Sequence, residues 1–208
     1  MMRRIAIAVL IALTVGPAFA QPPPAQTPPG GTPTRIRGTV DKLDGQNLTV
    51  KSRDGQTLTI ELAGNVAVIT LVKKSVDDIK VGDYVASTGV KGTDGKIHAV
   101  EVRIFPEAAR GTGEGQYPWD LMPDSIMTNA TVGKVDQAPQ GPVLHVTFKG
   151  TESEYTVGPE VPVLANGPGD PSLLKPGVAV FVIALKHEDG KLTSARLYAE
   201  KDGIKPPM

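Results

Sequence analysis

Apolar and polar side chains alternate with a period of two along most of the chain after residue 35, which is the pattern of half-buried β-strands. The clearest alternating segments are 36–40, 48–50, 58–62 and 100–104, and the fourth and fifth strands are expected over 84–90 and 97–104. Asp-Gly pairs follow or separate several of these segments, at Asp44-Gly45, Asp54-Gly55 and Asp94-Gly95, and such pairs are typical of tight hairpin turns. The pattern therefore predicts an all-β fold built from hairpins.

Residues 72–79 depart from this alternation. Ser75 is a candidate helix N-cap, and Asp77 and Asp78 follow it with the negative charge that favours a first helical turn. We expect one helical turn or a short helix here, as a crossing between the third and fourth strands. Three strands, a short crossing and two more strands is the element order of an OB-like barrel. A small SH3-like barrel or a β-sandwich is the alternative.

The second half of the chain repeats the first. Residues 66–103 align with residues 161–198 without a gap, and Arg37-Gly-Thr-Val corresponds to Asn129-Ala-Thr-Val further upstream. Two long copies indicate a domain duplication rather than a solenoid. We therefore expect two tandem OB-like five-stranded β-barrels, over residues 35–105 and 129–202. In the second copy, a Pro/Gly-rich crossing at 168–174 replaces the short helix.

The N-terminus has the layout of a secretory signal peptide over residues 1–20. A positive start precedes an apolar run at 5–15, which is too short to span a membrane, and Ala18-Phe19-Ala20 offers small residues for cleavage. Residues 21–34 contain six Pro and no charge, which predicts a disordered Pro-rich linker. Residues 203–208 are expected to form a C-terminal tail. We predict a periplasmic or secreted protein, with no membrane span after signal cleavage.

Charge and cysteine content narrow the function classes. The 208 residues carry 22 basic and 22 acidic side chains, and removal of Arg3 and Arg4 with the signal would leave 20 against 22. This balance lacks the basic footprint of a nucleic-acid-binding protein, so we expect no nucleic-acid partner. The absence of Cys excludes disulfide scaffolds, Cys-based zinc sites and a thiol nucleophile.

The connector between the copies, residues 106–128, is the most unusual stretch, because it holds the only Trp and a run of alternating Gly. A loop of about 20 residues in a compact protein is usually functional or disordered. One interpretation is that its large apolar side chains fill the seam between the barrels: Tyr117, Trp119, Leu121 and Met122. The other is a binding lip. Its candidate ligand-binding residues are Arg110, Glu114, Tyr117 and Trp119.

Several of these motifs resemble those of a known family. The run from Gly38-Thr-Val through Asp44-Gly, Leu48-Thr-Val and Asp54-Gly, with Val81-Gly-Asp downstream, resembles an uncharacterised family of bacterial exported OB-like β-domains, present here as a tandem repeat. The connector, from Arg110-Gly-Thr-Gly-Glu-Gly onwards, is similar to small hypothetical exported proteins. The resemblance implies an exported OB-like domain of unknown function and supplies no catalytic residues.

Candidate catalytic groups are sparse. His98, His145 and His187 lack the spacing of zinc or iron ligands. The serines lack the context of a nucleophile elbow. Glu101 and Arg103 are interpreted as solvated charges on the polar face of a strand, where such pairs contribute little. We therefore predict no enzyme activity and no cofactor.

The sequence favours an exported, non-catalytic binding or scaffolding protein of the bacterial envelope, with an unknown envelope protein, peptide or glycan as partner. Its oligomeric state is left open. The alternative is a periplasmic Cu(I)/Ag(I)-binding protein. Thioether sulfurs suit Cu(I), and a Trp face can stabilise a cation. The candidate metal residues are Met122, Met127 and Trp119.

Overall fold

The computed structural model describes residues 30–207, which form twelve β-strands and three single 3-10 turns. The predicted signal peptide and most of the predicted linker lie outside the described residues. The strands are β1 (Thr32–Asp44), β2 (Asn47–Ser52), β3 (Thr57–Lys74), β4 (Tyr84–Lys91), β5 (Ile97–Ile104), β6 (Gly115–Pro118), β7 (Ser125–Asp136), β8 (Val143–Phe148), β9 (Thr151–Thr156), β10 (Val163–Pro168), β11 (Ala179–Lys186) and β12 (Leu192–Ala199). The turns are η1 (Val76–Asp78), η2 (Glu107–Ala109) and η3 (Pro171–Leu173). The all-β prediction is confirmed.

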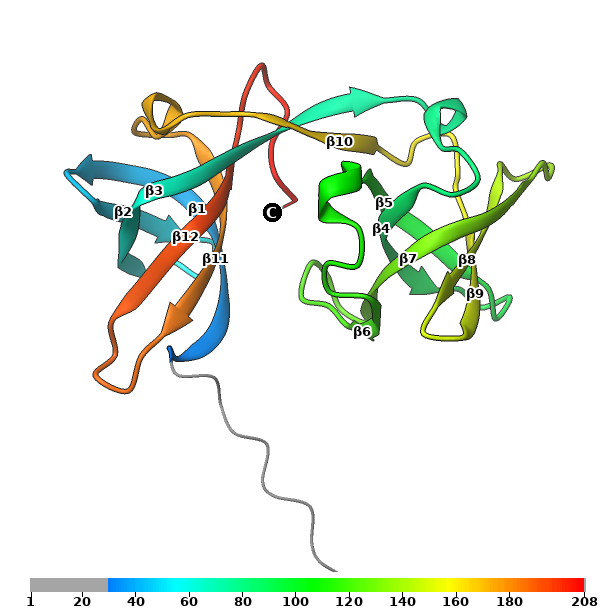
Figure 1. The fold of residues 1–208 in the computed structure, drawn as a ribbon, viewed down its shortest axis with the longest axis horizontal. Coiled ribbons are helices and arrows are strands. Elements are labelled where there is room, and N and C mark those ends of the chain that lie inside the picture. Colours follow the sequence, from blue (N-terminus) through cyan, green and yellow to red (C-terminus); the bar gives the residue numbers. More distant parts are fainter. Residues whose placement is uncertain (1–29, 208) are drawn as a thin grey trace, which may run out of the picture.

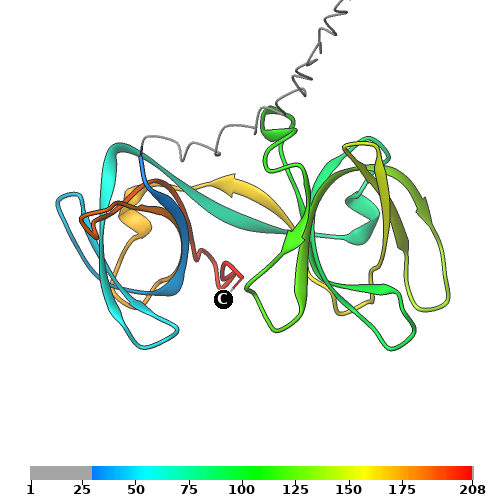
Figure 2. The same cartoon turned by 90° about the horizontal axis from the view of Figure 1, so that it is seen from below.

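The strands form two five-stranded barrels that lie side by side (Figure 1; Figure 2 shows both from below). Barrel 1 follows the order β1, β2, β3, β12, β11, and the parallel pairing of β12 with β3 closes the ring. Barrel 2 follows the order β7, β8, β9, β5, β4, and a short parallel pairing of β5 with β9 completes it. Closure leaves few unpaired strand edges.

Barrel 2 is built from one contiguous part of the chain, β4 to β9, whereas barrel 1 joins strands from the two ends of the chain. Strands β11 and β12 complete barrel 1 with β1 to β3, whereas β4 and β5 complete barrel 2 with β7 to β9. The units expected over 35–105 and 129–202 therefore each contribute strands to both barrels. Strand β3 runs out of barrel 1 and pairs antiparallel with β10 across the seam (Figure 1).

Side-chain size favours this exchange. Tyr155 is fully buried in the core of barrel 2, and a Cβ atom on Gly89 of β4 would lie 2.7 Å from its ring. The matching position on β11 is Ala184, which packs in the core of barrel 1 with the smaller Ile60. If β11 took the place of β4 in barrel 2, it would bring the Cβ atom of Ala184 against the ring of Tyr155. Strand periodicity does not reveal this, because β4 and β11 alternate alike.

The two barrels use the same register at matching positions. Arg37 of β1 lies opposite Phe181 of β11, and Asn129 of β7 lies opposite Ala86 of β4. Arg37 therefore matches Asn129, and Phe181 matches Ala86. Continuing along the same strands and onto β12 and β5, the further matched pairs are Arg35 and Met127, Ile183 and Thr88, Arg196 and Glu101, and Tyr198 and Arg103.

Both crossings contain a single 3-10 turn. In the first, Ser75 accepts a hydrogen bond from the backbone N–H of Asp77, and the Asp78 carboxylate accepts one from the N–H of Ser75. The helical turn that follows this capping box is only three residues long. The helical segment expected at 72–79 is therefore limited to η1. The second crossing holds η3, capped by Asp170, where the sequence analysis expected no helical turn.

Two segments expected to be irregular contain strands. Residues 32–34 of the predicted linker belong to β1, because β11 extends far enough to pair with them. Pro33 is tolerated there because β2 pairs with β1 only from Gly38 onwards, so the start of β1 is an edge on that side. In the connector, β6 pairs with β7, which itself begins at Ser125. The connector is thus held against barrel 2.

The apolar core has three parts. Each barrel encloses its own cluster, centred on residues such as Leu48 and Ile60 in barrel 1 and Leu144 and Tyr155 in barrel 2. A third cluster lies at the seam and contains Leu71, Leu164, Phe181 and Tyr198, with Trp119 packed against it. Within residues 30–207, no helix is long and apolar enough to cross a membrane.

Candidate ligand-binding cavity between the barrels

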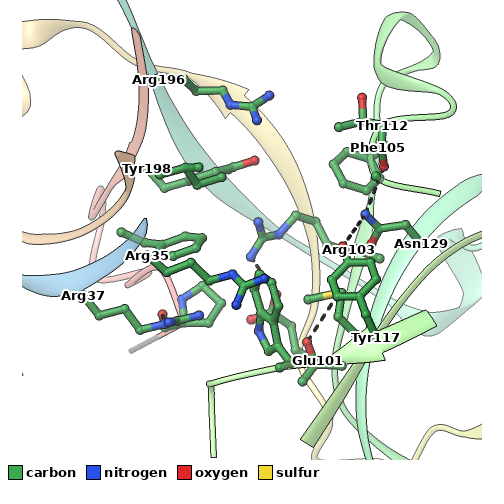
Figure 3. Close-up of a pocket in the computed structure, with 18 of the residues that line it drawn as sticks. Arg35, Arg37, Glu101, Arg103, Phe105, Thr112, Tyr117, Asn129, Arg196 and Tyr198 are labelled. Carbon is green, nitrogen blue, oxygen red and sulfur yellow. Dashed lines mark hydrogen bonds and ion pairs between the residues drawn. The ribbon is translucent and has the colours of Figure 1, made fainter. Parts of the chain in front are cut away.

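A cavity of about 470 Å³ lies between the two barrels, within the usual size range of small-molecule sites (Figure 3). Successive side chains of a strand point to opposite faces, so positions that alternate with the barrel core face outwards. Here the outward faces of the two barrels meet, and the connector closes part of the space between them. The wall comes from β1, β4, β5, β7, β11, β12 and the connector.

Arginine is concentrated in the wall. Of the six arginines between residues 30 and 207, four line the cavity, and none of the fourteen lysines does. Glu101 is the only acidic residue in the wall. The four lining arginines are Arg35, Arg37, Arg103 and Arg196. A planar guanidinium group can stack on an aromatic ring while its N–H edges donate to oxygen atoms, which an ammonium group cannot do.

Three of these guanidinium groups stack on aromatic rings of the seam. That of Arg103 lies 4.9 Å from the Tyr198 ring centroid, and that of Arg37 lies 4.4 Å from the Phe181 centroid. The rings of Phe181 and Tyr198 stack on each other at 5.9 Å. Arg103 comes from barrel 2 and the other three from barrel 1, so this stack joins the barrels across the seam (Figure 3).

Trp119 of the connector extends the stack. The guanidinium group of Arg35 lies 4.1 Å from the Trp119 ring centroid, and that of Arg37 lies 5.5 Å from it. We call the whole series the cation–π ladder: Arg103, Tyr198, Phe181, Arg37, Trp119 and Arg35. Each contact of this kind is worth roughly 0.5–2 kcal/mol, depending on exposure.

Arg37 is the most deeply buried cation of the ladder, with 3% of its surface exposed. Its Nη1 donates to the Asp120 carboxylate at 2.5 Å, and its Nε donates to the backbone oxygen of Pro207 at 3.0 Å. Nη2 is buried without a partner among the described residues. Burial lowers the pKa of Arg37, while Asp120 opposes that shift. The group stays charged at neutral pH, because its ordinary pKa is far above 7.

Glu101 and Arg103 form a buried ion pair, with Arg103 Nη2 donating to Glu101 Oε1 at 2.7 Å. Both residues are less than a tenth exposed, so the interpretation of solvated strand charges is wrong. The outer face of β5 is polar, as expected, but barrel 1 covers it. Arg103 Nε is buried without a partner among the described residues.

The remaining polar groups of the wall come from β12, β7 and the connector. Arg196 is exposed, and its side chain has no hydrogen-bond or ion-pair partner within residues 30–207. Asn129 Nδ2 donates to the Thr112 backbone oxygen at 3.0 Å and to the Tyr117 hydroxyl at 3.2 Å. Burial raises the pKa of Tyr117, against a weaker effect of Arg35. Tyr117 is therefore a neutral hydroxyl at physiological pH.

Two of the four predicted ligand-binding residues, Tyr117 and Trp119, line the cavity. The other two are absent from its wall and tie the connector to barrel 2. Arg110 binds the Glu107 carboxylate at 2.6 Å and the Gly82 backbone oxygen at 2.9 Å. Glu114 accepts a hydrogen bond from the Lys149 backbone N–H at 2.9 Å. Trp119 both lines the cavity and packs against the seam cluster, whereas Met122, which was also expected to fill the seam, is exposed.

The candidate metal residues are distributed between different environments. Met127 is buried in the cavity wall, whereas Met122 is exposed and lies outside the wall. Trp119 already has the Arg35 guanidinium group at its ring, so a metal cation there would meet a resident positive charge. Within the described part of the chain, no three His, Cys, Asp or Glu side chains gather as a metal site.

The sequence analysis missed the arginines of β1 and β12. The available signal was an i, i+2 spacing that puts two large side chains on one outward strand face: Arg35 with Arg37, and Arg196 with Tyr198. Such a face is ordinarily solvated, so the spacing becomes informative only when another surface covers it. Comparison with protein-family models, curated proteins and solved structures finds no match for this chain. The family resemblance stays a prediction.

Proposed function

We propose that this chain is an exported, non-catalytic binding protein of the bacterial envelope, and that its ligand occupies the cavity between the barrels. The observation that carries this proposal is the concentration of four arginines and a tryptophan in one cavity of ligand size. Ligand sites combine apolar walls with a few convergent polar groups, and this cavity has both. An exported small molecule, peptide or glycan fits such a site better than an extended protein surface does.

The strand order supports the finer view of the fold. The ring order β1, β2, β3, β12, β11, with a parallel closing pair, is the order of an OB-like barrel. The matched registers of the two barrels support a tandem duplication. We propose that two OB-like units arose by duplication, exchanged their last two strands and were exported by the signal peptide at residues 1–20.

Binding is favoured over catalysis by the state of the polar groups in the wall. The single carboxylate, Glu101, is held by Arg103, and no nucleophile in the described wall is hydrogen-bonded to a base. A hydrolytic site would need such a pair. The groups that remain available are cationic or neutral hydrogen-bond donors, and these recognise a ligand without transforming it.

The test is to fill the cavity and measure ligand retention. Ile183→Trp adds bulk at a wall position on β11, and Leu185→Trp adds the same bulk two residues further along the strand, outside the wall. Purified proteins are equilibrated with a mixture of envelope small molecules, and bound compounds are identified by mass spectrometry. We expect compounds that are retained by the natural protein and by Leu185→Trp but lost with Ile183→Trp. If none of the proteins retains any compound, the proposal is wrong.

A further inference from the structure

The cation–π ladder determines which part of each group faces a ligand. The rings of Trp119, Phe181 and Tyr198 already carry guanidinium groups or each other against their faces. A flat aromatic ligand would have to displace a guanidinium group in order to stack. A stacked guanidinium group still has its N–H edge free to donate in its own plane. The ladder therefore offers a ligand the N–H edges of its guanidinium groups rather than the faces of its aromatic rings.

Several of these N–H groups lack acceptors. Arg37 Nη2 and Arg103 Nε are buried without partners among the described residues, and both residues are less than a tenth exposed. An unpaired buried donor is unfavourable, and more so when it is charged. Arg196 adds an edge with no acceptor in the described chain, and in Figure 3 Arg103 and Arg196 both extend into the cavity. Arg103 and Arg196 can therefore donate to a ligand directly, and Arg37 can do so once Pro207 is displaced.

The charges in and beside the cavity wall are also unbalanced, with an excess of positive charge. Four arginines line the wall, against Glu101 in the wall and Asp120 on Arg37, so the described residues there carry two more positive than negative charges. The chain as a whole has a formal charge of zero, so this excess is local. A ligand with two negative charges would balance it.

We propose that the ligand of this cavity is a small oligoanion, carrying two or more carboxylate or phosphate groups that accept hydrogen bonds from the edges of Arg37, Arg103 and Arg196. This inference rests on the proposed function and names the ligand class of the same site. Guanidinium groups bind carboxylate and phosphate through paired N–H donors, which is why arginine is chosen for such ligands over lysine.

The protein's own acceptors indicate how the oxyanions would sit. Glu101 and Asp120 already contact Arg103 and Arg37 at 2.7 and 2.5 Å, and the Pro207 carbonyl occupies Arg37 Nε. The ligand adds acceptors at the remaining N–H groups of these arginines. To reach Arg37 it displaces Pro207 of the C-terminal segment, which enters the space between the barrels (Figure 1).

Trp119 allows a direct measurement, because it is the only Trp and lies in the wall. The purified protein is titrated with citrate, pyrophosphate, acetate and glucose, and Trp119 fluorescence is followed. We expect saturable changes with citrate, pyrophosphate or both, with dissociation constants below about 1 mM, and at least about tenfold weaker binding of acetate. Glucose is expected to leave the signal unchanged. The comparison of citrate with pyrophosphate distinguishes a carboxylate ligand from a phosphate ligand.

Charge removal inside and outside the cavity provides the matched variants. Arg196→Gln removes an exposed cavity arginine that bonds nothing in the described chain, and we expect it to weaken oligoanion binding about tenfold or more. Arg110→Gln removes an arginine outside the wall and is expected to leave binding unchanged. Arg103→Gln serves as a second cavity variant, with circular dichroism to confirm its fold.

Three results would overturn the inference: equal binding of acetate and citrate, no fluorescence change with either oligoanion, or equal losses in Arg196→Gln and Arg110→Gln. These failures are distinguishable from failure of the proposed function. If the mixture experiment yields a neutral or cationic compound that Ile183→Trp excludes, the cavity is a binding site and only the oligoanion class is wrong. If it yields nothing, both proposals fail.

Discussion

The two barrels present opposite chemistry to each other from the same backbone positions. Barrel 1 contributes large or cationic side chains to the cavity, namely Arg35, Arg37, Phe181, Ile183, Arg196 and Tyr198. At the matching positions, barrel 2 contributes mostly smaller or uncharged ones, namely Met127, Asn129, Ala86, Thr88, Glu101 and Arg103. Shared registers place each pair at equivalent positions, so the backbone determines where a side chain lies and the residue type in each barrel determines what it does.

This asymmetry creates both the cavity and the contact that spans it. Two faces like that of barrel 1 would place two clusters of arginine against each other, with strong repulsion at short range. The small residues of barrel 2, such as Ala86 and Thr88, leave room, and Arg103 stacks on its own counterpart, Tyr198. A cavity between equivalent strands thus depends on the two barrels being chemically different.

The largest expected effect comes from separating the halves. Residues 30–110 and 111–208 each hold the first three strands of one barrel and the last two of the other. We expect the second half alone not to form a folded monomer, because self-pairing would bring Ala184 against Tyr155, where barrel 2 has Gly89. The mixed halves are expected to regain cooperative thermal unfolding, followed by circular dichroism with mass determined by light scattering.

A folded monomeric second half would contradict the size argument and favour the sequential barrels expected from the sequence. Gly64 provides a control for this argument, because a Cβ atom there would meet only the Gln46 side chain at 3.7 Å. Gly64→Ala is expected to leave reassembly of the halves unchanged, whereas Gly89→Ala is expected to weaken it.

A smaller effect is expected when barrel 1 is given the cavity residues of barrel 2. Arg37→Asn copies Asn129 and removes the bonds to Asp120 and Pro207, so we expect a loss of about 2–3 kcal/mol in the free energy of unfolding. Arg35→Met copies Met127 but removes only a half-exposed ion pair at 3.8 Å and one ring contact, with an expected loss of about 1 kcal/mol or less.

Urea unfolding monitored by circular dichroism measures both losses. Trp119 fluorescence reports whether the connector stays in place, and we expect a red shift in Arg37→Asn only. Equal losses in the two variants would mean that burial of Arg37 has no energetic consequence.

The smallest expected effect is a pH dependence of the folding stability that arises at a tyrosine of barrel 2 and has no counterpart at the matching position of barrel 1. Tyr84 of β4 matches Ala179 of β11, and burial, assisted by the charge of Glu114, raises the pKa of Tyr84 to about 12. The unfolded chain loses this proton near pH 10. The stability contributed by the protonated Tyr84 hydroxyl is therefore fully present below pH 10 and is lost as the pH rises towards 12. We expect about 1 kcal/mol to be lost between pH 10 and 11.

Tyr84→Phe removes this titration together with the hydrogen bond from the hydroxyl to the Thr112 backbone oxygen. The difference in unfolding free energy between the natural protein and Tyr84→Phe is expected to narrow from pH 9 to pH 11, as measured by urea unfolding at each pH. The lysines that also titrate there cancel in this difference. A constant difference would show that the Tyr84 hydroxyl ionises equally in the folded and unfolded states.

Much of the architecture could be predicted from the sequence. Alternation identified most strands, and Asp-Gly turns placed hairpins at Asp44-Gly45 and Asp94-Gly95, because both signals act over a few residues. Ser75 was recognisable as a cap for the same reason. Of the cavity wall, Tyr117 and Trp119 were predicted as ligand-binding residues and Met127 as a candidate metal residue, since an apolar-rich connector is unusual in any fold.

Local pattern determined which residues form strands and which face of each strand is apolar. Only the tertiary structure decided which barrel each strand joins, and it did so through contacts between distant residues, such as the fit of Tyr155 against Gly89. The same holds for the cavity: Arg37 and Arg103 lie on polar strand faces that the sequence marks as solvated. They form a buried cationic site because the opposite barrel covers each of these faces. Which face is covered depends on how the two barrels pack, and strand periodicity does not encode this.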